Sequence, residues 1–182
     1  MHKNFRKNRK TVRQILNHHF DRFGKCDRIK MLASHLKMPT LFFEKKDEEK
    51  TMIPERLAAL REKMRAYGVD AYLVPTADYH ESEYVGTYFK ARTYITGFTG
   101  SAGTAVITQD EACLWTDGRY FVQAAKELAG TGVTLMKMGQ EGVPTVEEYL
   151  AANTKEGMTI GFDGRVVNEM LGEALEKTLP ER

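Results

Sequence analysis

The sequence predicts an α/β domain of three layers, in which helices flank a mixed β-sheet. Two observations carry this prediction: β-rich runs alternate with helical spacings from about residue 52 onward, and two of these runs are separated by only three residues. Alternating strands and helices are typical of parallel pairing, whereas so short a connection forms an antiparallel hairpin. A third is composition, since 42% apolar and 29% charged residues in a chain of 182 describe one globular domain with an extension.

The first predicted helix extends from Pro54 to Gly68. Proline suits the first turn of a helix, where its missing N–H costs nothing, and glycine is common just beyond the last turn. Between these two residues, apolar side chains recur at a spacing of three to four. A short strand at 71–74 follows, and we expect Pro75 to stop it.

The later elements continue the alternation. Residues 76–103 are rich in Tyr, Gly and Thr, which predicts an irregular stretch with a short helical turn at 81–85. The hairpin strands are predicted at 104–108 and 112–116, and Asp117 stands where a helix N-cap is expected. The remaining predicted elements are a helix at 118–128, a strand at 133–138, a helix at 146–153, a strand at 159–162 and a helix at 168–178.

The net charge of +2 conceals a division of the chain. Residues 1–37 carry eleven Lys and Arg against two Asp, a net charge of +9, whereas residues 38–182 sum to −7. We therefore predict a basic and then charged extension at 1–51, disordered or partly helical, followed by a domain at 52–182. The extension is interpreted as a solvated tail, with phosphate-directed binding of nucleic acid and an organelle transit peptide as alternatives.

Several classes of protein are excluded by what the sequence lacks. Its apolar runs are only a handful of residues long, far short of the roughly 20 that a membrane-spanning helix needs. The basic start is not followed by the apolar stretch of a signal peptide. Cys26 and Cys113 are too few for a disulfide framework or a four-ligand zinc site. We expect a cytoplasmic protein with no membrane partner.

Two segments are candidates for catalysis or metal binding. Glycine at every third position in 97–103 does not have the spacing of a phosphate-binding loop and leads into a strand, so tight turns and close packing explain it better. His80 and Glu83 could share one side of a turn, but a metal ion needs three or four donors and the domain has no second histidine. No serine or cysteine lies in a nucleophile motif, so we expect no catalytic residue and no metal site.

A third segment places an arginine where a helix disfavours it. Arg119 lies in the first turn after Asp117, at the positive end of the helix dipole. Such a placement suggests a carboxylate partner on another domain or a peptide ligand. Taken alone, these residues indicate a binding or scaffold domain rather than a catalyst.

Four sequence motifs occur together and in order between residues 74 and 139. They are VPTADYHESEY at 74–84, TGFTGSAGTA at 96–105, LWTDGRYFVQAA at 114–125 and TLMKMG at 134–139. In this set the chain closely resembles the N-terminal domain of the long, three-domain Xaa-Pro aminopeptidases (aminopeptidase P), a domain shared in fold with creatinase and prolidase. The resemblance covers about residues 52–179 and implies a mixed sheet flanked by helices, somewhat like that of ribonuclease H.

The resemblance also implies a parent enzyme that is a metallopeptidase, a hydrolase that removes an N-terminal residue preceding proline with two metal ions, commonly manganese. The ligands of those ions belong to a C-terminal domain whose motifs do not occur in this chain. We therefore expect a fragment or split chain that is inactive alone and has no cofactor of its own. Its expected partners are a peptide with proline at the second position and the missing catalytic domain, and nucleic acid is not expected.

Residue roles carried over from the family are few. The arginine of its T-D-G-R-Y motif is similar to one that contacts the substrate peptide, and here it is Arg119. His80, Glu83 and Asp117 are candidates for contacts with another domain or for the substrate side.

Two other functions stay open: a stand-alone binding module of the same fold, and a nucleic-acid-associated protein acting through the basic extension. Residues 1–51 match nothing in the family, and one hypothesis makes them a translated upstream leader. The intact mass of the native protein tests that hypothesis, because a mature N-terminus upstream of Met52 would contradict it.

Overall fold

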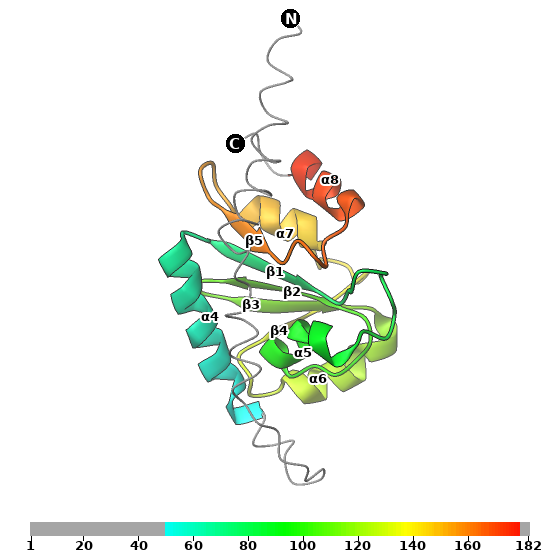
Figure 1. Ribbon diagram of the computed structural model, residues 1–182. Helices are drawn as coiled ribbons and strands as arrows, with labels where there is room; N and C mark the ends of the chain where they lie inside the picture. Colours follow the sequence, from blue (N-terminus) through cyan, green and yellow to red (C-terminus); the bar gives the residue numbers. More distant parts are fainter. Residues whose placement is uncertain (1–49, 179–182) are drawn as a thin grey trace, which may run out of the picture. The chain divides into compact units, whose positions relative to one another are not determined.

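The computed structural model describes residues 50–178 (Figure 1). The extension predicted at 1–51 falls outside the described residues, apart from its last two. The elements are, in order, α4 (Ile53–Tyr67), β1 (Ala71–Pro75), η1 (Thr87–Phe89), α5 (Ala91–Thr96), β2 (Thr104–Thr108), β3 (Ala112–Thr116), η2 (Gly118–Tyr120), α6 (Phe121–Leu128), β4 (Thr134–Lys137), α7 (Val146–Asn153), β5 (Ile160–Phe162) and α8 (Glu169–Thr178).

Five strands form one mixed sheet in the order β4-β3-β2-β1-β5. β2 pairs antiparallel with both β1 and β3, whereas β4 lies parallel to β3 and β5 lies parallel to β1. The turn between β2 and β3 closes where the Thr108 N–H donates to the Glu111 carbonyl at 2.8 Å. The predicted α/β class with a mixed sheet is confirmed, and so are both strands of the hairpin.

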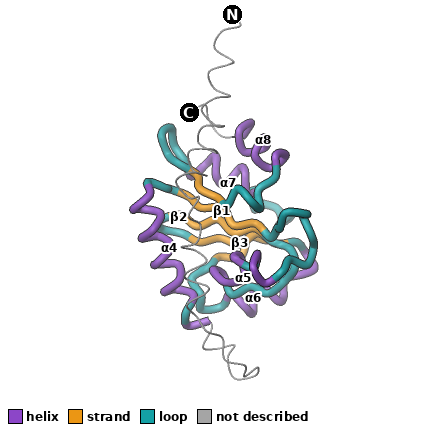
Figure 2. The backbone as a smooth tube through the Cα atoms, viewed as in Figure 1, coloured by secondary structure: helices purple, strands orange, loops and turns teal. Residues whose placement is uncertain are grey.

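Helices cover both faces of this sheet, so the domain has three layers (Figures 1 and 2). α4, α5 and α6 lie on one face, and α7 and α8 lie on the other. Side chains that alternate along β1, β2 and β3 pack against α7 and α8, as a strand period of two requires. The buried residues of this core are Ala71, Leu73, Val106, Cys113, Trp115, Tyr149, Leu150 and Leu175. Among the described helices, none has the length and apolar character needed to cross a bilayer.

Helix ends follow the local chemistry of the sequence. Pro54 lies in the first turn of α4, and Gly68 ends that helix in the left-handed conformation with φ of 64°. α7 begins with a capping box, because the Thr145 side chain accepts the Glu148 N–H at 3.2 Å and the Glu148 carboxylate accepts the Thr145 N–H at 2.8 Å. Both helices therefore lie where the sequence predicts them.

The prediction for residues 76–103 is wrong in two places. No helical turn forms at 81–85, because Asp78 Oδ1 accepts the N–H of His80 at 2.8 Å and that of Ser82 at 3.0 Å. This side-chain turn competes with helix formation. Two unpredicted helical elements, η1 and α5, follow instead. The threonine, tyrosine and isoleucine of α5 have low helix propensity, and burial of Arg92 and Ile95 overrides it.

Two smaller corrections concern element ends. Pro75 is the last residue of β1 rather than its stop, and it pairs with Thr104 at the strand end, where a missing N–H is tolerated. The helix predicted at 118–128 begins as the 3₁₀ turn η2 and continues as α6. Asp117 caps that turn as predicted, since its side chain accepts the Arg119 N–H at 3.0 Å.

Candidate functional site

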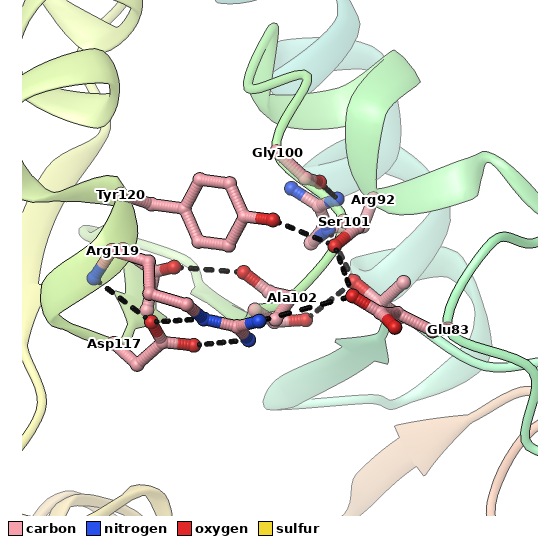
Figure 3. Close-up of polar contacts among 11 residues, drawn as sticks. Glu83, Arg92, Gly100, Ser101, Ala102, Asp117, Arg119 and Tyr120 are labelled. Carbon is pink, nitrogen blue, oxygen red and sulfur yellow. Dashed lines mark hydrogen bonds and ion pairs between the residues drawn. The ribbon is translucent and has the colours of Figure 1, made fainter.

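Three segments meet beside the end of β3, as Figure 3 shows. One is residues 77–86, here called the tyrosine loop, another is residues 97–103, called the glycine loop, and the third is the turn η2. Together they bring five polar side chains onto one surface, and we call this group the surface cluster. It consists of Glu83, Ser101, Asp117, Arg119 and Tyr120.

Arg119 is held by the carboxylate of its own N-cap residue. Its Nε donates to Asp117 Oδ1 at 3.0 Å and its Nη2 donates to Asp117 Oδ2 at 2.9 Å. This bidentate pair holds the pKa of Asp117 below its usual value and raises that of Arg119. The negative charge of the Asp117 carboxylate also explains why a cation is tolerated in the first helical turn. The sequence placed the carboxylate partner of Arg119 on another domain or in a peptide ligand, whereas the carboxylate that it binds here is that of Asp117 in the same turn.

The third nitrogen of Arg119 faces the tyrosine loop. Nη1 lies 3.8 Å from Glu83 Oε1, and the two side chains are 62% and 54% exposed. Ser101 Oγ lies 3.4 Å from the same Glu83 oxygen and 2.7 Å from the Tyr120 hydroxyl. The cluster thus offers a guanidinium, two carboxylates and two hydroxyls side by side at the surface. Such a set suits the binding of a polar or charged group rather than bond cleavage.

His80, the other residue inferred from the sequence, is not part of the cluster. It is exposed and takes part in the tyrosine loop through its N–H, which Asp78 accepts. The N–H groups of Ser82 and His80 hold the pKa of the Asp78 carboxyl below its usual value. The helical turn that would place His80 and Glu83 on one side does not form.

The glycine loop is fixed from the interior of the domain. Thr116 Oγ1 donates to the Ala102 carbonyl at 2.7 Å. The Glu127 carboxylate of α6 accepts the Thr99 N–H at 2.8 Å and the Thr99 hydroxyl at 2.7 Å. Arg92 of α5 donates to the carbonyls of two further loop residues. Three chain segments, β3, α5 and α6, therefore bind this loop.

The close packing expected from the glycine spacing is confirmed. A Cβ added at Gly100 would lie 2.3 Å from Phe98 Cζ and 2.8 Å from Tyr120 Cδ1, and one at Gly103 would lie 2.9 Å from the Trp115 carbonyl oxygen. Sequence reasoning missed Ser101 and Tyr120 as members of the cluster. The glycine spacing marked the right loop, but it could not show which side chain the loop presents.

An open hollow continues from the cluster along α6. It has a volume of about 430 Å³ and is lined by Arg119, Val122, Gln123, Lys126 and Glu127. Within residues 50–178, no three His, Cys, Asp or Glu side chains are grouped closely enough to hold a metal ion. The donor set of the described residues therefore does not fit a metal centre.

A protein-family model of the creatinase/prolidase N-terminal domain matches residues 56–182. The chain belongs to this family. The resemblance seen in the four motifs is thereby confirmed, and so is the creatinase-type fold.

Relatives with the creatinase N-terminal domain include several aminopeptidases. The chain is 40% identical over 140 residues to aminopeptidase P2 of Arabidopsis thaliana, covering 76% of this chain and 20% of that protein. It is 48% identical over 125 residues to a probable Xaa-Pro aminopeptidase P of Talaromyces marneffei, covering 69% of this chain and 19% of that protein. The chain thus spans about a fifth of the length of these relatives.

Solved structures agree with the creatinase-type fold. X-prolyl aminopeptidase of Caenorhabditis elegans, described as a cytosolic enzyme with a di-nuclear active site, matches with a TM-score of 0.64 and 37% identity over 69% of this chain and 22% of that one. The N-terminal domain of a metallopeptidase from Corynebacterium diphtheriae matches with a TM-score of 0.51 and 23% identity, over 70% of this chain and 89% of that one. The second match shows the fold alone.

Proposed function

We propose that this chain is the non-catalytic N-terminal domain of an Xaa-Pro aminopeptidase, and that it positions peptide substrates while packing against a catalytic part. The observation that carries this proposal is the way in which the Arg119 guanidinium is bound. Two of its nitrogens are committed to Asp117, which fixes the direction of the guanidinium. Among residues 50–178, the third, Nη1, makes only the long contact to Glu83. It is therefore oriented on the surface and available to a peptide carbonyl or carboxylate.

The tyrosine loop supports contact with another part of the enzyme. Tyr79 and Tyr84 are 63% and 79% exposed, and they flank the polar side chains of His80 and Glu83. Exposed aromatic side chains next to charges are typical of protein interfaces. We assign this loop to the interdomain contact and Arg119 to the substrate.

The metal chemistry of the reaction belongs to the catalytic part in this account. Relatives of this chain include an enzyme with a di-nuclear active site, and the resemblance implies two ions, commonly manganese. Since the described residues offer no grouped donors, we expect the purified chain to leave Xaa-Pro peptides intact with or without added manganese. Metal-dependent turnover by a homogeneous sample of the 182-residue chain would contradict this.

A chimera tests the substrate role. The N-terminal segment of Arabidopsis aminopeptidase P2 that matches this chain would be replaced by the matching residues of this chain, and hydrolysis of Ala-Pro-Ala would be followed. Arg119→Ala should raise KM about ten- to a hundred-fold, the cost of one charge-assisted hydrogen bond, with a smaller change in kcat.

Arg65→Ala is the matched control for this experiment. Arg65 is an exposed arginine on α4 whose Nη1 donates to the neutral side chain of Gln109 at 2.8 Å. Its removal should leave KM unchanged. Equal KM values in the Arg119→Ala and Arg65→Ala chimeras would refute the proposed role of Arg119.

A further inference from the structure

Arg92 is a buried cation whose hydrogen bonds all go to neutral groups. Only 4% of its surface is exposed. Its Nε donates to Thr76 Oγ1 at 2.6 Å, its Nη1 donates to the Phe98 carbonyl at 3.1 Å, and its Nη2 donates to the Gly100 carbonyl. The guanidinium also lies over the Phe98 ring, 4.7 Å from its centroid. Within residues 50–178, no carboxylate forms an ion pair with it.

Such a charge is unfavourable in a protein interior. Burial lowers the pKa of Arg92 to about 10, and the more distant Glu127 carboxylate opposes that effect only in part. A domain that needed only to fill this volume could do so with an apolar side chain at lower cost. The reason for an arginine must therefore lie in the carbonyl groups that it orients.

The two carbonyls belong to residues on either side of Thr99 in the glycine loop. Binding both of them with one planar guanidinium fixes the bend of the backbone between Phe98 and Gly100. At Gly100 there is no room for a Cβ beside the Phe98 and Tyr120 rings, which pack edge to face at 5.8 Å between centroids. The next residue, Ser101, then places its Oγ 2.7 Å from the Tyr120 hydroxyl.

We propose that Arg92 is a positioning residue for the surface cluster: by fixing the Gly100 carbonyl it sets Ser101, and through Ser101 it sets the Glu83 carboxylate against Arg119. Figure 3 shows this sequence of contacts, from the buried guanidinium through Gly100 and Ser101 to the exposed ion pair. Arg92 itself touches no ligand in this account. Its relevance to peptide binding rests on the function proposed above, whereas its effect on the geometry of the cluster does not.

The test compares Arg92→Met with a matched control in the full chain. Arg61 on α4 also donates to a backbone carbonyl, that of Thr108 at 2.9 Å, but at the opposite end of β2 from the glycine loop. Arg61→Met therefore removes a similar bond away from the cluster. Both substitutions should lower the midpoint temperature of thermal unfolding.

The reporters are NMR signals of the cluster and its loop. In Arg92→Met we expect the Nε–H resonance of Arg119 to shift and the Thr99 amide, which donates to Glu127, to exchange about ten- to a hundred-fold faster, as loss of one charge-assisted hydrogen bond implies. In Arg61→Met both signals should stay at their original values. A folded Arg92→Met protein with unchanged signals would overturn the proposal.

Arg92→Lys keeps the experiment decisive if Arg92→Met does not fold. Lysine retains the charge but cannot bind both carbonyls in the plane of a guanidinium, so the fold should persist while the Arg119 signal shifts. Unfolding of both variants would overturn the proposal, because Arg92 would then serve the fold as a whole. The proposed function fails separately, if Arg119→Ala leaves KM unchanged in the chimera while the Arg92 variants still shift the Arg119 signal.

Discussion

The glycine loop and the tyrosine loop are both irregular, and they meet at the surface cluster, but they are held in different ways. The glycine loop is fixed from the interior by Arg92, Thr116 and Glu127, all of which bond to its backbone. The backbone of the tyrosine loop is held by its own Asp78 carboxylate, its bonds to other segments come from the exposed side chains of Glu81 and Glu83, and Tyr79 and Tyr84 are exposed. One loop is therefore a fixed platform, and the other is a surface that can adapt to a partner. Glu83 belongs to the second and Ser101 to the first.

The two loops should differ most in the loss of stability caused by a Gly→Ala substitution in each. Gly100→Ala places a Cβ against the Phe98 and Tyr120 rings and should destabilise the chain by about 3 kcal/mol, at the upper end for overpacking. Gly86 is the last residue of the tyrosine loop. In Gly86→Ala the added Cβ meets nothing within 4 Å, so stability should change by less than about 0.5 kcal/mol. Urea unfolding of both variants measures the difference. Equal midpoints would show that the glycine loop accommodates a Cβ as easily as the tyrosine loop does.

A smaller difference in stability should result from neutralising one carboxylate that binds the glycine loop and one that belongs to the tyrosine loop. Glu127→Gln weakens the two bonds to Thr99 and should cost about 1–2 kcal/mol. Glu83→Gln, at an exposed ion pair, should cost less than about 0.5 kcal/mol. Thermal unfolding of both proteins at neutral pH is the measurement. A larger loss in Glu83→Gln would reverse the assignment of platform and adaptable loop.

The smallest effect concerns pH. The pKa values of Asp78 and Asp117 both lie below the ordinary value because folded-state bonds favour their charged forms. Those bonds therefore stabilise the chain above about pH 4 and are lost as the pH falls through the lowered values. In an NMR titration, the Ser82 amide should report Asp78 and the Arg119 Nε–H should report Asp117, each with a midpoint below the usual range for aspartate. Asp117→Asn should abolish only the second transition, and a midpoint at or above the usual range would contradict the pairing.

The sequence predicted the regular elements well because their causes are local. A proline and a glycine bound α4, Thr145 and Glu148 cap α7, and three residues close the hairpin of β2 and β3. Asp117 and Arg119 were found for the same reason, since they lie two residues apart on one turn. Arg92 and Ser101 were missed because their roles depend on carbonyl and hydroxyl groups that only tertiary folding brings to them. The same dependence explains α5, which forms against its residue propensities.

Amide hydrogen exchange in the isolated chain and in the chimera with Arabidopsis aminopeptidase P2 tests the central claim most directly. If the tyrosine loop faces the catalytic part, the amides of residues 79–86 should exchange more slowly in the chimera, while Thr99, already bonded to Glu127, should be protected equally in both proteins. Unchanged exchange at 79–86, with an active chimera, would contradict the assignment of this surface to the interdomain contact.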